Sequence, residues 1–508
     1  MKLILTERKS IDIKLGQYII DPIFQKIGKV ADEAGKEVYV VGGFVRDLFL
    51  NRKSKDYDFV TVGSGIELAQ RVADSFGHGA KLSVFPTYGT AQVKLKDLEL
   101  EFVGARKESY TRDSRNPIVE DGTLLEDISR RDFTINAMAI CLNQNRYGEL
   151  YDPYGGCQDL QKGIIRTPLD PDITFSDDPL RMLRAIRFAT QLYRIEVDDS
   201  AFNQGCNANQ SIRRSFRLTQ ETFDAIVRNA SRMEIITRER INEELMKIMK
   251  SPIPSIGWKL LDITGLLTFI FPSLMPLKGV ETKDGRGHKD NFYHTLQVLD
   301  NVASKTEDVW LRWAALLHDI AKPQTKRYDP ALGWTFHNHN YVGEKMIPRI
   351  FKEMKMPLND RMKYVAKMVG LHMRPQSVGE QGVTDSAVRR LITEAGNDID
   401  DLMILAESDI TSKQPDKVKR QLEGFKKLRA RMLDVKNADE LRNWKNPIDG
   451  NEIMEKLGIP PGKLIADIKQ MVKEAIIEGM IPYEHDAAWQ YLIDHYEDLM
   501  TPVNGLSS

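Results

Sequence analysis

An apolar segment that ends at two consecutive glycines constrains the fold of this chain more than any other sequence feature. Val38–Val41 has the composition of a buried strand, and Phe44–Leu50 has that of a helix. Between them, Gly42 and Gly43 let backbone amides approach a phosphate group closely. Arg46 then falls on the first helical turn, where its guanidinium can bind a triphosphate. The sequence therefore predicts a nucleotide-binding turn between a strand and a helix.

Two aspartates on the next apolar segment predict a metal-binding strand. In Asp56–Val60 the alternation of a strand puts Asp56 and Asp58 on one face and two aromatic side chains on the other. Paired carboxylates supply the hard oxygen ligands that two Mg²⁺ ions need, and they leave positions open for substrate phosphates. Taken alone, the glycines are an ordinary turn and the aspartates a solvated surface pair. Their combination at this spacing favours chemistry.

Length and composition describe a multidomain protein. The 508 residues are too many for one core and indicate three or four domains, with 42% hydrophobic and 29% charged residues. The 72 basic and 73 acidic side chains nearly cancel, so any nucleic-acid surface must be local. One helical segment is rich in basic residues and is either such a surface or a solvated helix face. Its basic residues are Lys417, Lys419, Arg420, Lys426, Lys427, Arg429 and Arg431.

Cysteine usage and the N-terminal sequence indicate a cytoplasmic protein. Cys141, Cys157 and Cys206 include no close-spaced pair and are too few for a disulfide framework. The first residues lack an apolar run of signal-peptide length, and no segment reaches membrane-spanning length. We therefore expect a cytoplasmic location and no membrane partner, and the oligomeric state stays open.

A predicted hairpin and a polar stretch follow the aspartates. Ala91–Leu95 and Leu98–Val103 alternate around a short turn and predict two antiparallel strands. Glu99 and Glu101 share a face of the second strand, so either carboxylate can join the two aspartates, or both lie on a solvated face. Residues 104–115 lead into a polar stretch with little periodicity, which ends at Arg130.

Two arginine-rich motifs come next. In the first, Arg131, Asp132 and Asn136 supply donors for phosphate and acceptors for ribose hydroxyls. The second begins with acidic residues and a proline at a predicted helix start, and then spaces its arginines three residues apart. Such a row is either a salt-bridged helix face or a ligand-binding face. Its members are Asp178, Arg181, Arg184 and Arg187.

A second group of metal-ligand residues lies later in the chain. Six of the nine histidines fall between residues 288 and 372, which argues against random placement. A single buried histidine is most often a core residue. Here His318 and Asp319 are adjacent, His294 precedes them and Asp409 follows, and this combination favours a metal site.

The first group of motifs resembles the nucleotidyltransferase superfamily of DNA polymerase β, specifically the class II group of bacterial CCA-adding tRNA nucleotidyltransferases and poly(A) polymerases. The resemblance implies that Glu101 completes the catalytic carboxylates and that the polar stretch before Arg130 is the mobile loop that precedes an Arg-Arg-Asp motif. Asp178 and Arg181 match the motif that selects the incoming nucleotide without a template strand. Thr237–Leu245 resembles the neck helix, which implies structural support.

Nucleotide selection by this pair has a simple chemical basis. Cytosine and adenine both offer an amine donor beside a ring-nitrogen acceptor, which complements a carboxylate beside a guanidinium. Uracil and guanine present the reverse order and would leave buried polar groups unpaired, at a cost of roughly 1–3 kcal/mol per group.

The second group resembles the HD superfamily of metal-dependent phosphohydrolases. The residues that match its four-ligand core are His294, His318, Asp319 and Asp409. Those that match the positions of a second metal in its di-metal members are His339 and His372, and weaker candidates are His288 and His337. A divalent transition metal held there would polarise a phosphoryl oxygen and activate water.

Together these resemblances imply an α+β multidomain protein. We expect a polymerase-β-like head with a small mixed sheet, followed by an all-helical neck and body, an HD domain and a helical tail. The expected domain bounds are residues 20–165, 166–275, 276–430 and 431–508. The implied reaction adds CMP, CMP and AMP from CTP and ATP to the 3′ end of tRNA, with Mg²⁺ in the head.

Other functions share parts of this pattern. A poly(A) polymerase, or an enzyme that adds only CC or only A, has similar motifs. A protein that acts mainly as an HD-type nucleotide phosphohydrolase, with a vestigial head, and an RNA-binding protein without catalysis are disfavoured. The intact Asp56, Asp58 and Arg131 argue against both.

Overall fold

The computed structural model describes most of the chain. The described residues are 15–54, 56–96, 98–111, 114–193, 195–198, 211–287, 290–380, 384–412, 414–443, 446–477 and 480–500. The chain divides into two compact units, of which the larger is Met1–Ser377 with Glu394–Glu423 and the smaller is Val378–Thr393 with Gly424–Ser508. No helix in the described ranges combines the length and the apolar composition needed to cross a membrane.

The head is built around a mixed sheet of seven strands in the order β3-β4-β5-β2-β1-β8-β9. Strand β2 pairs antiparallel with β1 and parallel with β5. The predicted strands on both sides of the glycine pair, and the predicted hairpin, which is β4 and β5, are confirmed. The strands are β1 Val38–Val41, β2 Asp56–Thr61, β3 Lys81–Phe85, β4 Thr90–Leu95, β5 Leu98–Gly104, β8 Ala139–Cys141 and β9 Leu150–Tyr151.

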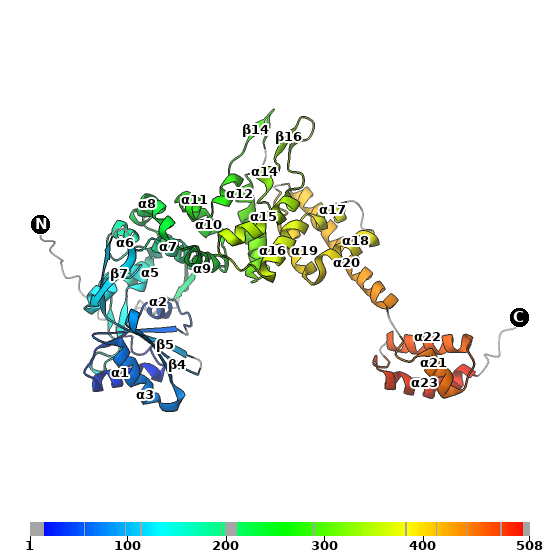
Figure 1. Ribbon diagram of the computed structural model, residues 1–508, viewed down its shortest axis with the longest axis horizontal. Helices are drawn as coiled ribbons and strands as arrows, with labels where there is room; N and C mark the ends of the chain where they lie inside the picture. Colours follow the sequence, from blue (N-terminus) through cyan, green and yellow to red (C-terminus); the bar gives the residue numbers. More distant parts are fainter. Residues whose placement is uncertain are drawn as a thin grey trace. The chain divides into compact units, whose positions relative to one another are not determined.

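Helices α1 (Pro22–Glu33) and α3 (Gly65–Phe76) lie on one face of this sheet (Figure 1). Phe59 of β2 and Phe102 of β5 are fully buried and stack with ring centroids 4.9 Å apart. Their burial fixes the strand register, because a shift by one residue would turn both rings to the other face. The Asp-x-Asp carboxylates of β2 therefore point to the opposite face.

The polar stretch before Arg130 contains regular secondary structure, namely two strands and the helix α4. Strands β6 and β7 pair antiparallel there and form a separate hairpin, whose turn residues 112–113 lie outside the described residues. A backbone ladder needs no apolar alternation, so the hydrophobic pattern did not reveal it. The further elements of the head are α2 Gly43–Phe49, β6 Arg106–Thr111, β7 Ser114–Asp121, α4 Leu124–Ser129 and α5 Gly156–Lys162.

The segment after the head is largely helical, as expected, with short strand pairs β10–β13 and β11–β12. Helix α7 packs against α9 and α10 and carries the arginine row into the interface with the head. The elements are β10 Ile164–Ile165, α6 Pro171–Asp177, α7 Leu180–Gln191, β11 Ile195–Asp198, β12 Ser211–Arg214, β13 Arg217–Leu218, α8 Gln220–Asn229, α9 Arg238–Met249, α10 Ser255–Ile263 and α11 Leu266–Ile270.

The histidine-rich segment folds into packed helices with two hairpins, β14–β15 and β16–β17. Its hairpin strands are β14 Thr282–Lys283, β15 Arg286–Gly287, β16 Arg327–Asp329 and β17 Gly333–Thr335. Its helices are α12 Asn291–Ala303, α13 Val309–Leu317, α14 Lys322–Thr325, α15 His339–Glu353, α16 Asp360–Leu371, α17 Arg374–Glu380 and α19 Ile399–Ser408.

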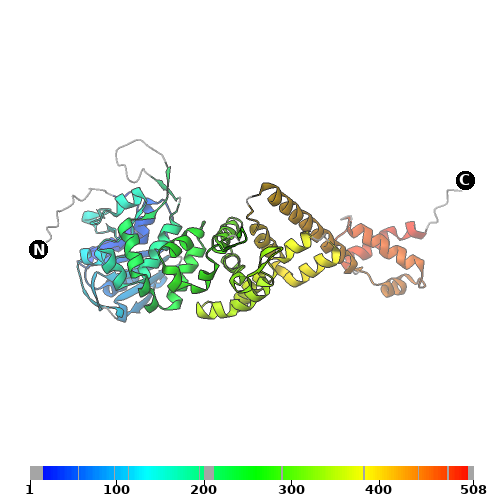
Figure 2. The same cartoon turned by 90° about the horizontal axis from the view of Figure 1, so that it is seen from above.

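The smaller unit ends in a bundle of three helices, coloured orange to red in Figure 2. Ile453, Ile468, Val472 and Leu492 are fully buried between these helices. The basic segment noted in the sequence lies on α20, a helix that begins in the larger unit and ends in the smaller one, and Lys417, Arg420 and Lys427 are exposed there. The helices are α18 Asp385–Ala395, α20 Pro415–Asn443, α21 Gly450–Leu457, α22 Lys463–Ile477 and α23 His485–Met500.

Candidate functional site

A polar cavity of about 330 Å³ lies at the end of β1. Arginines outnumber carboxylates among the residues that line it, so it favours an anionic ligand. The lining residues are Gly42, Gly43, Arg46, Asp58, Arg130, Arg131, Asp132, Asn136, Asp178, Leu180, Arg181, Arg184, Phe188 and Arg240. The cavity thus brings together most of the head residues that the sequence singled out.

The glycine pair shapes the cavity wall beside the strand. Gly42 has a φ of 73°, and a β carbon there would lie 3.1 Å from Nη1 of Arg131 and 3.6 Å from Oδ2 of Asp58. Glycine adopts this backbone without strain and leaves room for both side chains. Because Val41 is the partner of Asp58 across β1 and β2, the sheet register holds the carboxylate at this wall.

Asp58 and Glu101 are direct neighbours across the parallel strands β2 and β5. Burial raises the pKa of Asp58, an effect that Arg131 partly offsets and Asp56 reinforces. Burial, together with the charge of Asp58, raises the pKa of Glu101. Carboxylates that are crowded and repel one another fit a divalent cation, which removes the repulsion.

Asp56 and Glu99, the second pair of neighbouring carboxylates on β2 and β5, are more exposed to solvent than Asp58. Asp56 is exposed and is the neighbour of Glu99 in the same two strands. Nζ of Lys94 donates a hydrogen bond of 2.9 Å to Glu99. Glu99 already has a cationic partner, so the geometry favours Glu101 over Glu99 as the third carboxylate. Asp56 and Glu101 both lie outside the cavity lining, so Asp58 alone of the three predicted catalytic carboxylates lines the cavity.

Asp132 organises the arginine side of the cavity. Its carboxylate accepts hydrogen bonds from Nε of Arg184 at 2.8 Å and from Nδ2 of Asn136 at 3.1 Å. Burial opposes ionisation, but Arg184 and Asn136 prevail and lower the pKa of Asp132 to about 2. Asn136 also accepts a hydrogen bond of 2.9 Å from Arg46. One buried carboxylate therefore fixes the positions of two arginines.

The predicted base-reading residues lie at the far end of the cavity. Asp178 caps the end of α6, one turn before the arginines of α7, and its carboxylate lies 3.6 Å from Nη2 of Arg240. Arg181 donates a hydrogen bond of 2.8 Å to the carbonyl oxygen of Arg130. A carboxylate and a guanidinium thus face the same cavity from adjacent helices.

Arg187, the last member of the predicted row, lies outside the cavity lining. It is 8% exposed and pairs with the buried Glu244 of α9 at 3.0 Å. Residues three positions apart on a helix differ in direction by about 60°, so the row slants around α7, and Arg187 faces the body instead of the cavity.

Four residues that line the cavity are absent from the set predicted from the sequence, and they are Arg130, Leu180, Phe188 and Arg240. The resemblance implies only structural support for the segment of Arg240, but Arg240 lines the cavity from α9. Phe188 adds an aromatic surface, with the guanidinium carbons of Arg46 and Arg184 at 5.2 Å and 5.8 Å from its ring centroid. Phe188 follows Arg184 by four residues, and this helical spacing is the signal that would have found it.

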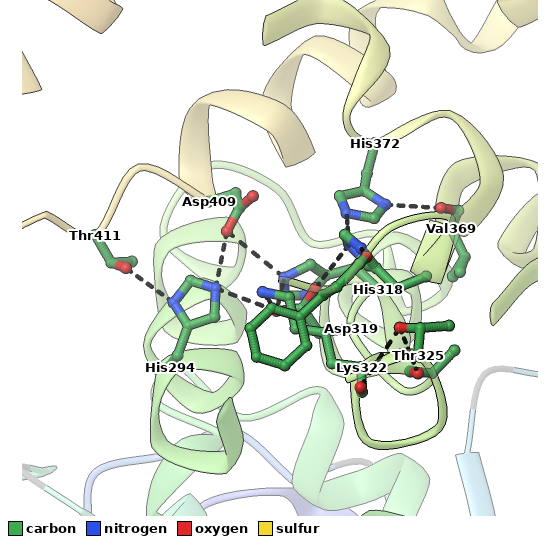
Figure 3. A network of polar contacts seen from close by, with 12 residues as sticks. His294, His318, Asp319, Lys322, Thr325, Val369, His372, Asp409 and Thr411 are labelled. Carbon is green, nitrogen blue, oxygen red and sulfur yellow. Dashed lines mark hydrogen bonds and ion pairs between the residues drawn. The ribbon is translucent and has the colours of Figure 1, made fainter. Parts of the chain in front are cut away.

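The histidine-rich segment brings its candidate ligands together in a second, buried site (Figure 3). Two clusters share Asp319 and have geometry suited to a metal ion, and their members are His294, His318 and Asp319 in one and Asp319, His339 and His372 in the other. Asp409 lies 2.9 Å from Nε2 of His294 and 3.6 Å from Nε2 of His318. All six residues predicted for this site therefore meet at one centre.

Backbone carbonyls orient the rings in this centre. Nδ1 of His318, His339 and His372 each lies 2.7 Å from the carbonyl oxygen of the residue three positions earlier. Nδ1–H donation to these carbonyls turns each Nε2 to the centre, as metal-bound histidines require. Nε2 of His318 is buried and lies 3.2 Å from the carboxylate of Asp319 without the geometry of a hydrogen bond, so the donor set fits a cation.

The charges of this centre also suit a cation. Burial favours the neutral ring of His318, but the adjacent Asp319 and Asp409 raise its pKa to about 10. Burial and the charge of His318 lower the pKa of His372 to about 4. Buried carboxylates thus need positive charge here. Of the weaker candidates, His337 is exposed and belongs to neither cluster, and His288 lies outside the described residues.

Comparison with protein families finds three matching regions. Residues 38–166 match the poly(A) polymerase head domain, and residues 215–277 match a probable RNA- and SrmB-binding site of polymerase A. Residues 291–411 match the HD domain.

Three relatives show how far the similarity extends. An A-adding tRNA nucleotidyltransferase of Aquifex aeolicus is 49% identical over 154 residues, which are 30% of this chain and 18% of that protein. An A-adding tRNA nucleotidyltransferase of Deinococcus radiodurans is 29% identical over 88% of this chain and 93% of its own length. A multifunctional CCA protein of Nitrosococcus oceani is 33% identical over 63% of this chain and 71% of its own length.

Solved structures share the fold. A tRNA nucleotidyltransferase complexed with a primer tRNA and an incoming ATP analog has a TM-score of 0.53 and 25% identity, over 80% of this chain and 99% of the other. The Thermotoga maritima CCA-adding enzyme complexed with tRNA has a TM-score of 0.57 and 21% identity, over 96% of this chain and 100% of the other.

Proposed function

Because this chain belongs to the tRNA nucleotidyltransferase family, whose members carry the poly(A) polymerase head, we propose that it adds CMP, CMP and AMP to the 3′ end of tRNA. The substrates are CTP and ATP, and no template strand is needed. The observation that carries this proposal is the single cavity that joins Asp58, a cluster of arginines and the Asp178–Arg181 pair. A nucleoside triphosphate fits this arrangement, because its phosphates can lie against the arginines beside Asp58 while its base lies against Asp178 and Arg181.

The head residues divide the reaction among them. Asp56, Asp58 and Glu101 would hold Mg²⁺, which lowers the charge on the triphosphate and activates the attacking 3′ hydroxyl when bound. Arg46 and Arg131 lie beside the carboxylates and would bind the triphosphate.

The far end of the cavity would select the base. Asp178 would accept a hydrogen bond from the exocyclic amine of cytosine or adenine, and Arg181 would donate to the ring nitrogen. Arg240 lies against Asp178 and would orient its carboxylate. Phe188 offers a ring on which a base can stack. A pocket that reads this shared edge accepts two nucleotides and rejects UTP and GTP.

One observation favours a narrower reaction. The Aquifex and Deinococcus relatives are both A-adding enzymes, and the latter matches over nearly its whole length. The second candidate is therefore an enzyme that adds only the terminal AMP. The cavity has the same hydrogen-bonding groups for either reaction, so the two differ in the RNA end that is accepted.

The histidine centre would supply a separate activity. The head and HD families are both metal-dependent. We propose that the six ligands hold one or two divalent transition metal ions, which would polarise a phosphoryl oxygen and activate water for hydrolysis. The cytoplasmic location and the four domain ranges given above stay predictions.

The test uses two tRNA transcripts, one that ends at the base before CCA and one that ends in CC. Each is incubated with the purified protein, Mg²⁺ and one labelled nucleoside triphosphate at a time. Incorporation of CMP into the first transcript and of AMP into the second supports complete CCA addition. Incorporation of AMP alone supports the A-adding alternative, and incorporation of neither nucleotide would refute both.

A further inference from the structure

The strand registers place an open face of the head sheet next to the catalytic carboxylates. Asp58 is the neighbour of Glu101, Glu101 of Gln92, and Gln92 of Ser83, so these four side chains form a row across β2, β5, β4 and β3. Neighbouring strands are about 4.8 Å apart, so the row continues for about 10 Å beyond Glu101. It ends at β3, the edge of the sheet.

This face is open, whereas α3 covers the opposite face of β4 and β5. Ala91, Val93 and Leu100 on the covered face are fully buried beneath α3. On the open face Lys81 and Phe85 of β3 are exposed, Phe85 to 45%. Side chains along β4 and β5 alternate between buried and more exposed positions. This alternation is typical of an antiparallel sheet with one face packed on the core and the other open to solvent or a partner.

The chemistry of the open face suits single-stranded RNA. Phe85 is the register partner of Thr90 and shares the face of Glu101 and Gln92, where an exposed ring can stack on a base. Lys81 has no ion-pair partner among the residues that the structure describes, so its ammonium is available to a phosphate. Arg106 donates a hydrogen bond of 3.3 Å to the carbonyl of Tyr88 and holds the turn that follows Phe85.

The direction of the reaction assigns this face to one substrate. The triphosphate cavity lies on the β1 side of Asp58, with the glycine pair and the arginines. In phosphoryl transfer the attacking and leaving oxygens are roughly in line. With the leaving group on the β1 side, the open β5-β4-β3 side is the side left for the 3′ hydroxyl to approach the phosphorus.

We propose that the open face of β5, β4 and β3 binds the single-stranded 3′ end of the tRNA during nucleotide addition. Phe85 stacks on a base near the 3′ end, Lys81 contacts a backbone phosphate, and Gln92 lies beside the terminal ribose, next to Glu101. This inference rests on the proposed function, because it assumes that a 3′ hydroxyl attacks at Asp58 and Glu101.

The test measures steady-state AMP addition to the CC-ending transcript by Phe85→Ala, Phe85→Tyr and Lys81→Glu. Phe85→Ala should raise the KM for the transcript about tenfold, because one stacking contact is lost, while the KM for ATP stays unchanged. Phe85→Tyr keeps a ring and should restore the KM of the wild type. Lys81→Glu should raise the KM for the transcript and reduce its dependence on salt.

Two control substitutions match these changes in position and charge. Val84→Ala alters the adjacent exposed residue, which points to the opposite face as the partner of Ala91. Lys29→Glu reverses an exposed charge on α1. Both should leave the KM for the transcript within about twofold of the wild type.

The possible outcomes separate this inference from the proposed function. If the wild type adds no nucleotide to either transcript, the proposed function itself fails. If the wild type adds AMP but Phe85→Ala and Lys81→Glu keep the KM of the wild type for the transcript, the inference is overturned. An equal rise in the KM for ATP would also overturn it, because the face would then belong to the incoming nucleotide.

Discussion

Replacement of Asp132 by asparagine should destabilise the head in a pH-dependent way. The carboxylate is 7% exposed, and its partners lower its pKa from 3.8 to about 2. Each pKa unit corresponds to about 1.4 kcal/mol, so the ionised form contributes about 2 kcal/mol to folding at neutral pH. The amide introduced by Asp132→Asn would keep the shape of the side chain but lose this charge-dependent part.

The sign of the pH dependence follows from the lowered pKa. The folded state binds the proton less tightly than the unfolded state, so the stabilisation is complete well above pH 4 and disappears as the pH falls through about 2. At pH 3 about half of it should remain. The difference between wild type and Asp132→Asn should therefore shrink from about 2 kcal/mol at pH 7 to about 1 kcal/mol at pH 3.

Urea titrations followed by circular dichroism at pH 7 and pH 3 measure this difference in the free energy of unfolding. The relevant transition is the one whose midpoint the substitution shifts. Glu99→Gln is the control, because Glu99 pairs with Lys94 on the surface with 47% of its side chain exposed. Such a pair contributes at most about 1 kcal/mol. A difference for Asp132→Asn that is the same at both pH values, or that is absent at pH 7, would refute the argument.

Two further predictions separate the roles of the proposed sites. Asp178→Ala should reduce discrimination against UTP and GTP by roughly tenfold or more, because the base loses a paired group, whereas Arg46→Ala should weaken the binding of all four nucleotides alike. Competition assays with mixed nucleotides check this, and unchanged rejection of UTP and GTP by an active Asp178→Ala enzyme would contradict it. The double variant His318→Ala, Asp319→Ala should lose bound transition metal and any phosphohydrolase activity but keep nucleotide addition, since the two sites share no ligand. Metal analysis tests this ligand set, with His337→Ala as the control because it changes an exposed histidine of the same segment. An unchanged metal content in the double variant would show that the ligand set is wrong.

Local sequence patterns predicted the parts of the head that depend on local geometry. The alternation around Asp58 and the glycines before α2 correctly indicated a strand, a tight turn and a helix. Burial of Phe59 and Phe102 on one face explains why the alternation was informative, because a single register satisfies it. The choice between Glu99 and Glu101 needed the structure, since both lie on the same face of one strand.

Features that depend on contacts between distant segments escaped the sequence. Arg240 and Asp178 form an ion pair although they are far apart in the sequence. No periodicity in the sequence links the two residues. The hairpin β6–β7 is local and escaped for a different reason, because its strands lack apolar alternation. In contrast, the histidine centre could be anticipated from residue types, because six ligands of this kind are rarely gathered in one segment by chance. The carbonyl partners that orient its rings became visible only in the structure.

Nucleotide addition by Asp58→Asn tests the central claim most directly. Because burial raises the pKa of Asp58, its charge is unfavourable in the folded head without a cation. The amide removes both this cost and a metal ligand, so Asp58→Asn should be as stable as the wild type or more stable. It should also fail to extend a transcript that lacks its 3′ end when CTP, ATP and Mg²⁺ are present. Near-normal extension by the folded variant would contradict the account, because the head would then catalyse addition without the carboxylate on which the mechanism depends.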